Sequence, residues 1–285
     1  MPGTLYIVAT PIGNLEDVTL RALRILREVS VIAAEDTRRT ARLLQQYSIS
    51  TPTTSLHQHN EGLRGPVLLS RLLAGESIAL VSDAGTPVVS DPGSALVASA
   101  HAAGIRVEPI PGASAAIAAL SVSGLPAEQF TYLGFPPARG NARKNWFAAA
   151  SRETRTFILY EAPHRIRQTL EDLLAAVGDR DLFVGRELTK LHEELVVRPI
   201  SEHLKNMTEP RGEFTLVVSG ESVLDIGQTT YSETTLRTDF ASLTAAGSTP
   251  REAVRALARK HTLPSRDVYA IVHQVSADGG ARGAQ

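Results

Sequence analysis

The chain of 285 residues contains no cysteine, which excludes disulfides, zinc–cysteine sites, iron–sulfur clusters and thiol nucleophiles. No hydrophobic run approaches the ~20 residues that a membrane-spanning helix needs. The first residues, MPGTLYIVATPIGN, lack the basic start of a signal peptide. Neither sign of charge dominates, since 29 Lys and Arg stand against 30 Asp and Glu, and this excludes a histone-like polycation. We therefore expect a soluble, cytoplasmic protein with no membrane association.

Three common motifs are also missing. The residues after the first apolar segment are Thr10-Pro11-Ile12-Gly13-Asn14 rather than GxGxxG, so a dinucleotide fingerprint is absent. No Walker A sequence occurs, and we expect no nucleoside triphosphate hydrolysis. Ser114 lacks the second glycine of GxSxG and is therefore not the nucleophile of a hydrolase elbow.

The first part of the chain alternates short apolar segments with segments of helical periodicity. Leu20, Leu23 and Leu26 recur on one helix face between the apolar segments 4–9 and 31–34. Alternation with short connections predicts an α/β fold with a mainly parallel sheet, covered by helices on both faces.

The α/β pattern starts again after the turn residues Gly124–Pro126, and there a mixed sheet is expected. Beyond Gly220 the sequence becomes polar, and Thr249, Pro250 and Glu252 then form a helix-start pattern. The predicted organisation is an N-terminal α/β domain (1–122), a second α/β domain (123–220), a linker (221–232), a small helical module (233–277) and a flexible tail (278–285).

Polar, glycine and proline residues gather where the expected strands of the first domain end. Because the carboxyl ends of parallel strands meet at one edge of a sheet, we expect a ligand site there. The segment SDAGTPVVSDPG is the most distinctive, since it holds two carboxylates and several hydroxyls in a rigid turn; capping of a strand and a helix is the alternative explanation. The five loops are residues 10–14, 35–39, 55–61, 82–93 and 109–114.

Histidine offers little basis for a metal site. His57 and His59 are the only histidines close together in the sequence, with Glu61 as the nearby carboxylate. We expect no metal and interpret the pair as substrate contact or plain surface.

Two groups of basic residues favour contact with a phosphate backbone. Arg139, Arg143 and Lys144 lie in a segment rich in Pro, Gly and Asn that we interpret as a loop, with Trp146 and Phe147 directly after it. The second group lies on the expected C-terminal helices and consists of Arg251, Arg255, Arg259, Lys260 and Arg266. A solvated face is the alternative explanation for either group, but the two groups together favour RNA.

Seven segments, in order from residue 4 to about residue 220, carry a family resemblance. They are TLYIVATPIGNLEDVTLRAL (4–23), AAEDTRRT (33–40), SDAGTPVVSDPG (82–93), PIPGASAAIAALSVSGLP (109–126), YEAPHRI (160–166), GRELTKLHEE (185–194) and GEFTLVV (212–218). Together they closely resemble the ribosomal RNA small subunit methyltransferase I family of the tetrapyrrole-methylase fold group. The first loop and Gly85-Thr86-Pro87 differ from the GxGxGD-like and GDP-containing loops usual in tetrapyrrole methylases, which favours the ribosomal RNA branch.

The resemblance implies an enzyme that depends on S-adenosylmethionine, with two α/β domains of the tetrapyrrole-methylase type and the cofactor in the cleft between them. It implies methylation of the ribose 2′-hydroxyl of a cytidine in the decoding centre of 16S ribosomal RNA. The expected partners are that RNA or the small ribosomal subunit, and a second copy of the chain in a homodimer. The cofactor contacts of the group, carried over residue by residue, fall on Pro11, Asp83, Thr86, Val89, Ala115, Ala116, Tyr160, Gly185 and Phe214.

Methyl transfer to a ribose hydroxyl benefits from a base beside a weak nucleophile. We expect Glu161 or Asp36 to lie nearest to that hydroxyl, with Glu187 as a further carboxylate at the same edge. Pairs of opposite charge in these segments can equally be structural salt bridges. Contacts with the RNA are expected from Arg38, His59, Asn60, Glu61, Arg139, Arg143, Lys144, Arg165 and Lys190.

Two other functions remain open from the sequence. The first is a methyltransferase that acts on a tetrapyrrole, which the basic segment 139–144 and the departures at Gly13, Asn14 and Thr86 disfavour. The second is an RNA-binding assembly factor without a cofactor, which the intact small-residue loops disfavour.

Overall fold

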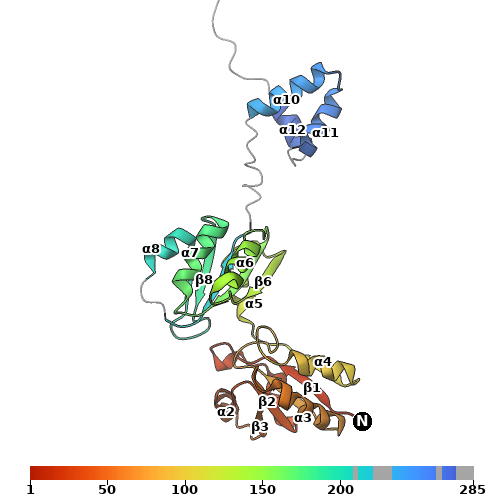
Figure 1. The fold of residues 1–285 in the computed structure, drawn as a ribbon, viewed down its shortest axis with the longest axis vertical. Helices are drawn as coiled ribbons and strands as arrows, with labels where there is room; N and C mark the ends of the chain where they lie inside the picture. Colours follow the sequence, from red (N-terminus) through yellow and green to blue (C-terminus); the bar gives the residue numbers. More distant parts are fainter. Residues whose placement is uncertain (208–210, 221–232, 261–264, 274–285) are drawn as a thin grey trace, which may run out of the picture. The chain divides into compact units, whose positions relative to one another are not determined.

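A computed structural model describes residues 1–207, 211–220, 233–260 and 265–273 (Figure 1). The predicted linker, the flexible tail and residues 274–277 lie outside the described residues, as do the side chains of Arg259 and Arg266. The chain divides into two units, residues 1–220 and 221–285.

Five parallel strands form the first sheet of the larger unit, in the order β3-β2-β4-β1-β5, as the alternating pattern predicts. Strands β2 and β4 are buried at every residue because helices cover both faces of the sheet. The strands are β1 (Thr4–Val8), β2 (Val31–Ala34), β3 (Thr53–Ser55), β4 (Ile78–Val81) and β5 (Arg106–Ile110). Between and after them lie η1 (Leu15–Asp17), α1 (Leu20–Glu28), α2 (Thr37–Gln46), α3 (Glu61–Leu73), α4 (Ser94–Ala102) and α5 (Ala115–Ser123).

The second sheet is mixed, as expected, and has the order β6-β7-β10-β8-β9. Strands β6 and β7 are parallel, whereas the other neighbours are antiparallel. Its strands are β6 (Phe130–Gly134), β7 (Thr156–Glu161), β8 (Asp181–Arg186), β9 (Glu194–Pro199) and β10 (Phe214–Val218). Its helices are α6 (Gly140–Ala150), α7 (Ile166–Val177) and α8 (Ile200–Asn206).

Helix α5 ties the two sheets together. It follows β5 of the first sheet, but its residues Ala119 and Leu120 pack against Ile158, Phe183 and Val217 of the second sheet. A helix that the sequence places in the first domain therefore contributes to the core of the second.

The basic segment before Trp146 is not the loop that we expected, because most of it lies in α6. Arg143, Phe147 and Ala150 recur at helical spacing and are buried on one face of this helix. The proline and glycine residues of the segment end at Gly140, where the helix begins with φ of 75°.

The described part of the smaller unit contains the helices α10 (Glu233–Ala245), α11 (Pro250–Lys260) and α12 (Ser265–His273). Leu236, Leu257 and Val268 belong to its own apolar core. The predicted helix start is confirmed, since Thr249 and Glu252 exchange side-chain and backbone hydrogen bonds ahead of α11. Among the described residues no helix is long and apolar enough to span a bilayer.

Candidate active site

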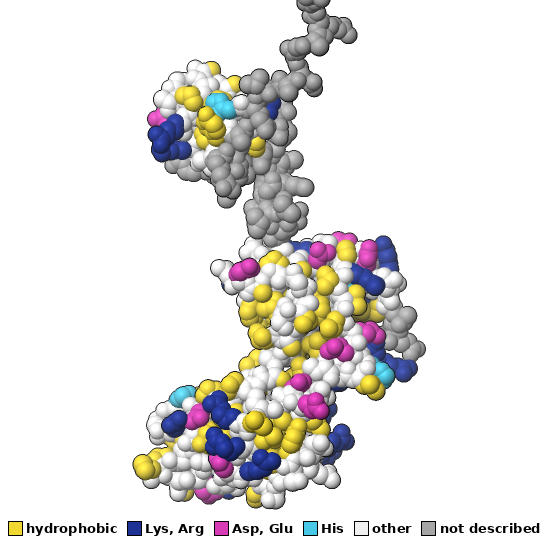
Figure 2. All heavy atoms as spheres, turned by 180° about the vertical axis from the view of Figure 1, so that it is seen from behind, with side chains coloured by type: hydrophobic (Ala, Val, Ile, Leu, Met, Phe, Trp, Pro, Cys, Tyr) yellow, Lys and Arg dark blue, Asp and Glu magenta, His cyan; other side chains and the backbone are white. Residues whose placement is uncertain are grey.

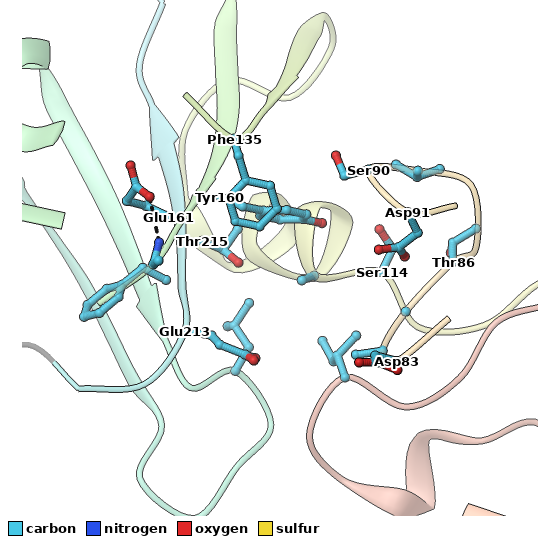
Figure 3. Close-up of a pocket in the computed structure, with 18 of the residues that line it drawn as sticks. Asp83, Thr86, Ser90, Asp91, Ser114, Phe135, Tyr160, Glu161, Glu213 and Thr215 are labelled. Atoms are coloured by element: carbon cyan, nitrogen blue, oxygen red, sulfur yellow. Dashed lines mark hydrogen bonds between the residues drawn. The ribbon is translucent and has the colours of Figure 1, made fainter. Parts of the chain in front are cut away.

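A cavity of about 450 Å³, here called the cleft cavity, lies where the carboxyl edge of the first sheet faces the second sheet (Figure 3). Residues of the first sheet and its loops line one side, and the ends of β7 and β10 with the loop after β8 line the other. The position agrees with the expectation that ligands bind beyond the carboxyl ends of parallel strands.

Two loops that line the cleft cavity hold residues in the left-handed backbone region. Val88 and Ser90 have φ of 75° and 66° in the loop after β4, and Glu187 and Thr189 have φ of 52° and 66° in the loop after β8. This conformation is costly for branched residues such as valine and threonine. Backbone strain of this kind gathers at ligand sites, and here both strained loops border the same cavity.

The loop after β1 closes tightly onto the loop after β8. A Cβ atom on Gly13 would lie 2.5 Å from Cγ of Lys190 and 2.6 Å from the carbonyl oxygen of Leu188. The N–H of Asn14 donates to Oγ1 of Thr189 at 3.0 Å. Glycine at position 13 is therefore required for the approach of these two loops.

Carboxylates dominate the first-sheet side of the cleft cavity, where Glu35, Asp83 and Asp91 lie (Figure 3 labels the last two). Burial raises the pKa of Asp91 to about 6, and the nearby charge of Glu35 adds to the rise. Burial also raises the pKa of Glu35. Arg39 pairs with Asp83 at 3.3 Å. Burial and the repulsion between neighbouring carboxylates both make their ionised form unfavourable, and a positively charged ligand would relieve both effects.

Aromatic rings cover another part of the cavity wall. The ring centroids of Tyr160 and Phe135 lie 5.4 Å apart, and those of Tyr160 and Tyr132 lie 5.2 Å apart. The Tyr160 hydroxyl accepts a hydrogen bond from the N–H of Ala116 at 3.0 Å, which fixes the ring against the start of α5. Burial raises the pKa of this hydroxyl, so it remains protonated. Such a wall suits a flat, apolar ring.

Most of the residues expected to contact a cofactor meet at the cleft cavity. Gly185 lies against Leu188 and outside the cavity lining, and the N–H of Ala116 donates to the Tyr160 hydroxyl. Pro11 lines a neighbouring cavity. The expected residues that line the cleft cavity are Asp83, Thr86, Val89, Ala115, Tyr160 and Phe214.

Glu161 does not have the free carboxylate that we expected of a base. Tyr160 and Glu161 both belong to the residues that line the cavity, but side chains alternate along a strand, and the carboxylate of Glu161 points away from the cavity (Figure 3). That carboxylate is fully buried, pairs with Arg165 and accepts a hydrogen bond from Thr169 at 2.6 Å. Glu161 and Arg165 therefore connect the end of β7 with the start of α7, and a role of either residue at the substrate stays a prediction.

Asp36 is also occupied by its surroundings. Its carboxylate caps the start of α2 by accepting from the N–H of Arg38 at 2.8 Å, and it pairs with the guanidinium of the same residue. Hydrogen bonds from Arg38 lower the pKa of Asp36 to about 2, which makes it a weak base. Asp36 lies outside the set of residues that line the cleft cavity.

Three of the residues expected to contact RNA have side chains held by hydrogen bonds within the protein. Glu61 accepts from the N–H of Ala95 at the start of α4, and Asn60 holds the turn after β3 through bonds to Ser55. Arg143 is buried, and its guanidinium donates to Asp172, Thr169 and the carbonyl of Pro137. None of these three side chains can reach out to a nucleic acid without breaking those bonds.

The other residues expected to contact RNA lie either in the cleft cavity or on the exposed surface outside it. Lys190 lines the cleft cavity and donates to Glu187 and Glu213. Arg38, His59, Arg139 and Lys144 are exposed and lie outside the cavity lining.

Four lining residues, Asp91, Glu35, Arg39 and Glu213, are absent from the contacts that the sequence predicts. The first three lie in the loops after β2 and β4, where the sequence does predict a ligand site. Glu213 precedes β10, and no local pattern points to it. Among the described residues no group of His, Asp and Glu side chains is arranged to hold a metal ion.

A second cavity, of about 380 Å³, adjoins the first and is here called the arginine cavity. Both cavities are lined by Arg39, Asp83, Lys190 and Glu213, which therefore form a shared wall. The arginine cavity also takes Arg42, Thr40 and Leu43 from α2.

Comparison with known proteins places these features in a family. A family profile described as Tetrapyrrole (Corrin/Porphyrin) Methylases matches residues 4–203. A protein of Synechocystis sp. named ribosomal RNA small subunit methyltransferase I is 48% identical, with 97% of this chain and 100% of that protein covered. The protein of the same name from Bacillus subtilis is 41% identical, with coverage of 95% and 94%.

Solved structures agree on the fold. Diphthine synthase aligns with a TM-score of 0.59 at 17% identity, over 76% of this chain and 90% of that chain. Uroporphyrin-III C-methyltransferase from Thermus thermophilus, complexed with S-adenyl homocysteine, aligns with a TM-score of 0.55 at 20% identity, over 79% and 100%. At this identity the likeness is one of fold alone.

Proposed function

The chain belongs to the ribosomal RNA small subunit methyltransferase I family of tetrapyrrole methylases, and on this premise we propose that it methylates ribosomal RNA. In the proposed reaction, the 2′-oxygen of a cytidine ribose in the decoding centre of 16S ribosomal RNA takes the methyl group of S-adenosylmethionine. The sulfur–methyl bond breaks as the oxygen–methyl bond forms, and S-adenosylhomocysteine and the hydroxyl proton are released. The observation that carries the proposal is the cleft cavity, which joins carboxylates, aromatic rings and strained loops from segments shared with this family.

The residues of the cleft cavity fit this cofactor. Asp83, Asp91 and Glu35 would hold positive charge, and Tyr160 with Phe135 would hold a flat ring. When bound, S-adenosylmethionine supplies a methyl group that is already activated by a positively charged sulfur. The raised pKa of Asp91 supports this fit. Burial makes the ionised carboxylate unfavourable, so a cationic ligand stabilises it more than it would stabilise an exposed carboxylate.

Because the donor is already activated, the protein acts chiefly by alignment and by exclusion of water. Lys190 lies on the wall between the two cavities. Although burial works against its charge, hydrogen bonds to Glu187 and Glu213 raise its pKa, so it stays protonated. A protonated lysine at this position would stabilise the negative charge that develops on the attacking ribose oxygen.

The test uses small ribosomal subunits from cells that lack this gene. Purified protein and labelled cofactor should produce a 2′-O-methylated cytidine in 16S ribosomal RNA, located by ribose-methylation mapping. Calorimetric titration with S-adenosylmethionine alone should show binding. Absence of cofactor binding would favour an assembly factor, and a spectroscopic response to a porphyrinoid with no RNA methylation would favour a tetrapyrrole acceptor.

We further propose that the protein is a homodimer. Hydrophobic side chains gather on the part of the surface that belongs to the second sheet (Figure 2). Ile117 and Val122 of α5 and Leu195 and Val197 of β9 are each more than 40% exposed, at 51%, 52%, 43% and 46%. Exposed apolar area of this kind is typical of protein interfaces. Sedimentation should give twice the chain mass of 30.5 kDa, and a monomer at micromolar concentration would contradict the proposal.

A further inference from the structure

The arginine cavity contains features that the cofactor does not explain. Arg39, Arg42 and Lys190 face two carboxylates there, Asp83 and Glu213. Arg39 pairs with Asp83, and Lys190 pairs with Glu213 at 3.0 Å. The side chain of Arg42 makes no hydrogen bond or ion pair with another described residue. Three cations and two carboxylates line the cavity, and Lys190 pairs in addition with Glu187 outside it.

The two arginines of this cavity lie on one face of α2. Asp36 caps the start of this helix and pairs with Arg38, whereas Arg39 and Arg42 lie in its first and second turns. Arg39 and Arg42 are three residues apart and therefore share a helix face, on which an anion could neutralise both.

Thr40 gives a second, independent observation. It lines the arginine cavity and is 5% exposed, and its hydroxyl has no hydrogen-bond partner among the described residues. A buried hydroxyl without a partner is unfavourable, and in a native protein it calls for an explanation such as a ligand.

We propose that the arginine cavity holds a backbone phosphate of the RNA, next to the ribose that is methylated. The inference rests on the proposed function and adds a specific positioning site to it. Arg42 and Arg39 bind the phosphate oxygens, and the Thr40 hydroxyl donates a hydrogen bond to the bound nucleotide. Because the two cavities share a wall, a phosphate in the arginine cavity brings the neighbouring sugar up to the cleft cavity.

The test compares Arg42→Gln with Arg64→Gln. Arg64 on α3 is also exposed and without a side-chain partner among the described residues, and it lines neither cavity. With small subunits from cells lacking the gene, Arg42→Gln should raise KM for the subunits roughly fivefold. It should also lower the slope of log KM against log salt by about 0.7–0.9, the effect of one phosphate contact. Arg64→Gln should change neither, and the affinity of both variants for S-adenosylmethionine should equal that of the wild type.

Thr40→Val supplies a second readout. It keeps the shape of the side chain and removes the unpartnered hydroxyl, so the melting temperature should not fall while KM for the subunits rises. If wild-type protein methylates the subunits but Arg42→Gln behaves as Arg64→Gln does, or Thr40→Val leaves KM unchanged, the phosphate site is wrong. If wild-type protein fails to methylate the subunits at all, the proposed function itself is overturned.

Discussion

The negative charge of Asp91 lowers the stability of the folded protein, and in our proposal the same charge binds the cationic cofactor. Its pKa is about 6 in the fold, against 3.8 as the ordinary value. The folded chain therefore holds the proton more tightly than the unfolded chain, and ionisation of Asp91 lowers stability as the pH rises from about 4 through about 6. Above about pH 6 the whole loss of folding stability is present unless a cation binds to Asp91.

Asp91→Asn should accordingly raise the melting temperature of the ligand-free protein at pH 8 by about 1–2 °C, with a smaller gain at pH 5. The same change should weaken binding of S-adenosylmethionine roughly tenfold at pH 8, because a carboxylate that faces the cation is lost. Thermal denaturation and calorimetric titration measure the two effects. Asp17→Asn, at an exposed carboxylate of η1, is the control and should change neither.

Glu161 is the opposite case, a buried carboxylate whose partners are all protein groups. Glu161→Gln leaves the partly buried Arg165 without its ion pair, and we expect a loss of about 3 kcal/mol in the free energy of unfolding. Turnover per folded molecule should remain close to that of the wild type. Glu28→Gln breaks an exposed pair with Arg24 and should cost less than about 1 kcal/mol. Normal stability with lost turnover in Glu161→Gln would restore this residue as the base.

At the scale of elements, the contact between the loops after β1 and β8 holds the cleft in shape. Gly13→Ala would place a methyl group within 2.6 Å of Leu188 and Thr189 atoms. We expect a loss of about 1–3 kcal/mol from overpacking and at least a tenfold loss in affinity for S-adenosylmethionine.

Gly62→Ala is the matched control, because nothing lies within 4 Å of the added Cβ and the position is helical. It should stabilise the protein by about 0.5–1 kcal/mol and leave cofactor affinity unchanged. Denaturant titration and calorimetry test both variants, and similar behaviour of the two would contradict a role for the loop contact.

The sequence predicted the elements better than the directions of side chains. Apolar runs and helical spacing located β1, β2, β4 and most helices, because these elements bury one face or both. They missed α6, where prolines and a glycine before the helix resemble a loop, and β3, which has three residues. Alternation along β7 already implied that Glu161 and Tyr160 face opposite sides, although the family segment contains both.

The sequence predicted where the candidate site lies, but not which side chains contact one another there. The loops at the carboxyl edge do meet at one cavity, because parallel strands bring their ends together. The partners of Asn60, Glu61 and Arg143 lie on other elements, and no local pattern in the sequence reveals them. Lys190 and Glu213 join the site only through the antiparallel pairing of β8 and β10.

At the scale of the whole molecule, the two units divide the proposed work. Residues 1–220 contain both cavities and their own apolar clusters, whereas the described helices α10, α11 and α12 have a separate core. The smaller unit carries Arg251, Arg255 and the half-exposed Tyr269 around a surface cavity. Cationic and aromatic side chains together suit contact with RNA.

Deletion of the residues after Gly220 should therefore leave affinity for S-adenosylmethionine within twofold of the full chain. It should weaken binding to small ribosomal subunits roughly tenfold, because phosphate and stacking contacts of the smaller unit are lost. Tyr269→Ala in the full chain should reproduce part of that loss without removing a helix. Calorimetry for the cofactor and filter binding for the subunits separate the two affinities. Equal losses in both would mean that the smaller unit supports the fold of the larger one rather than contacting RNA.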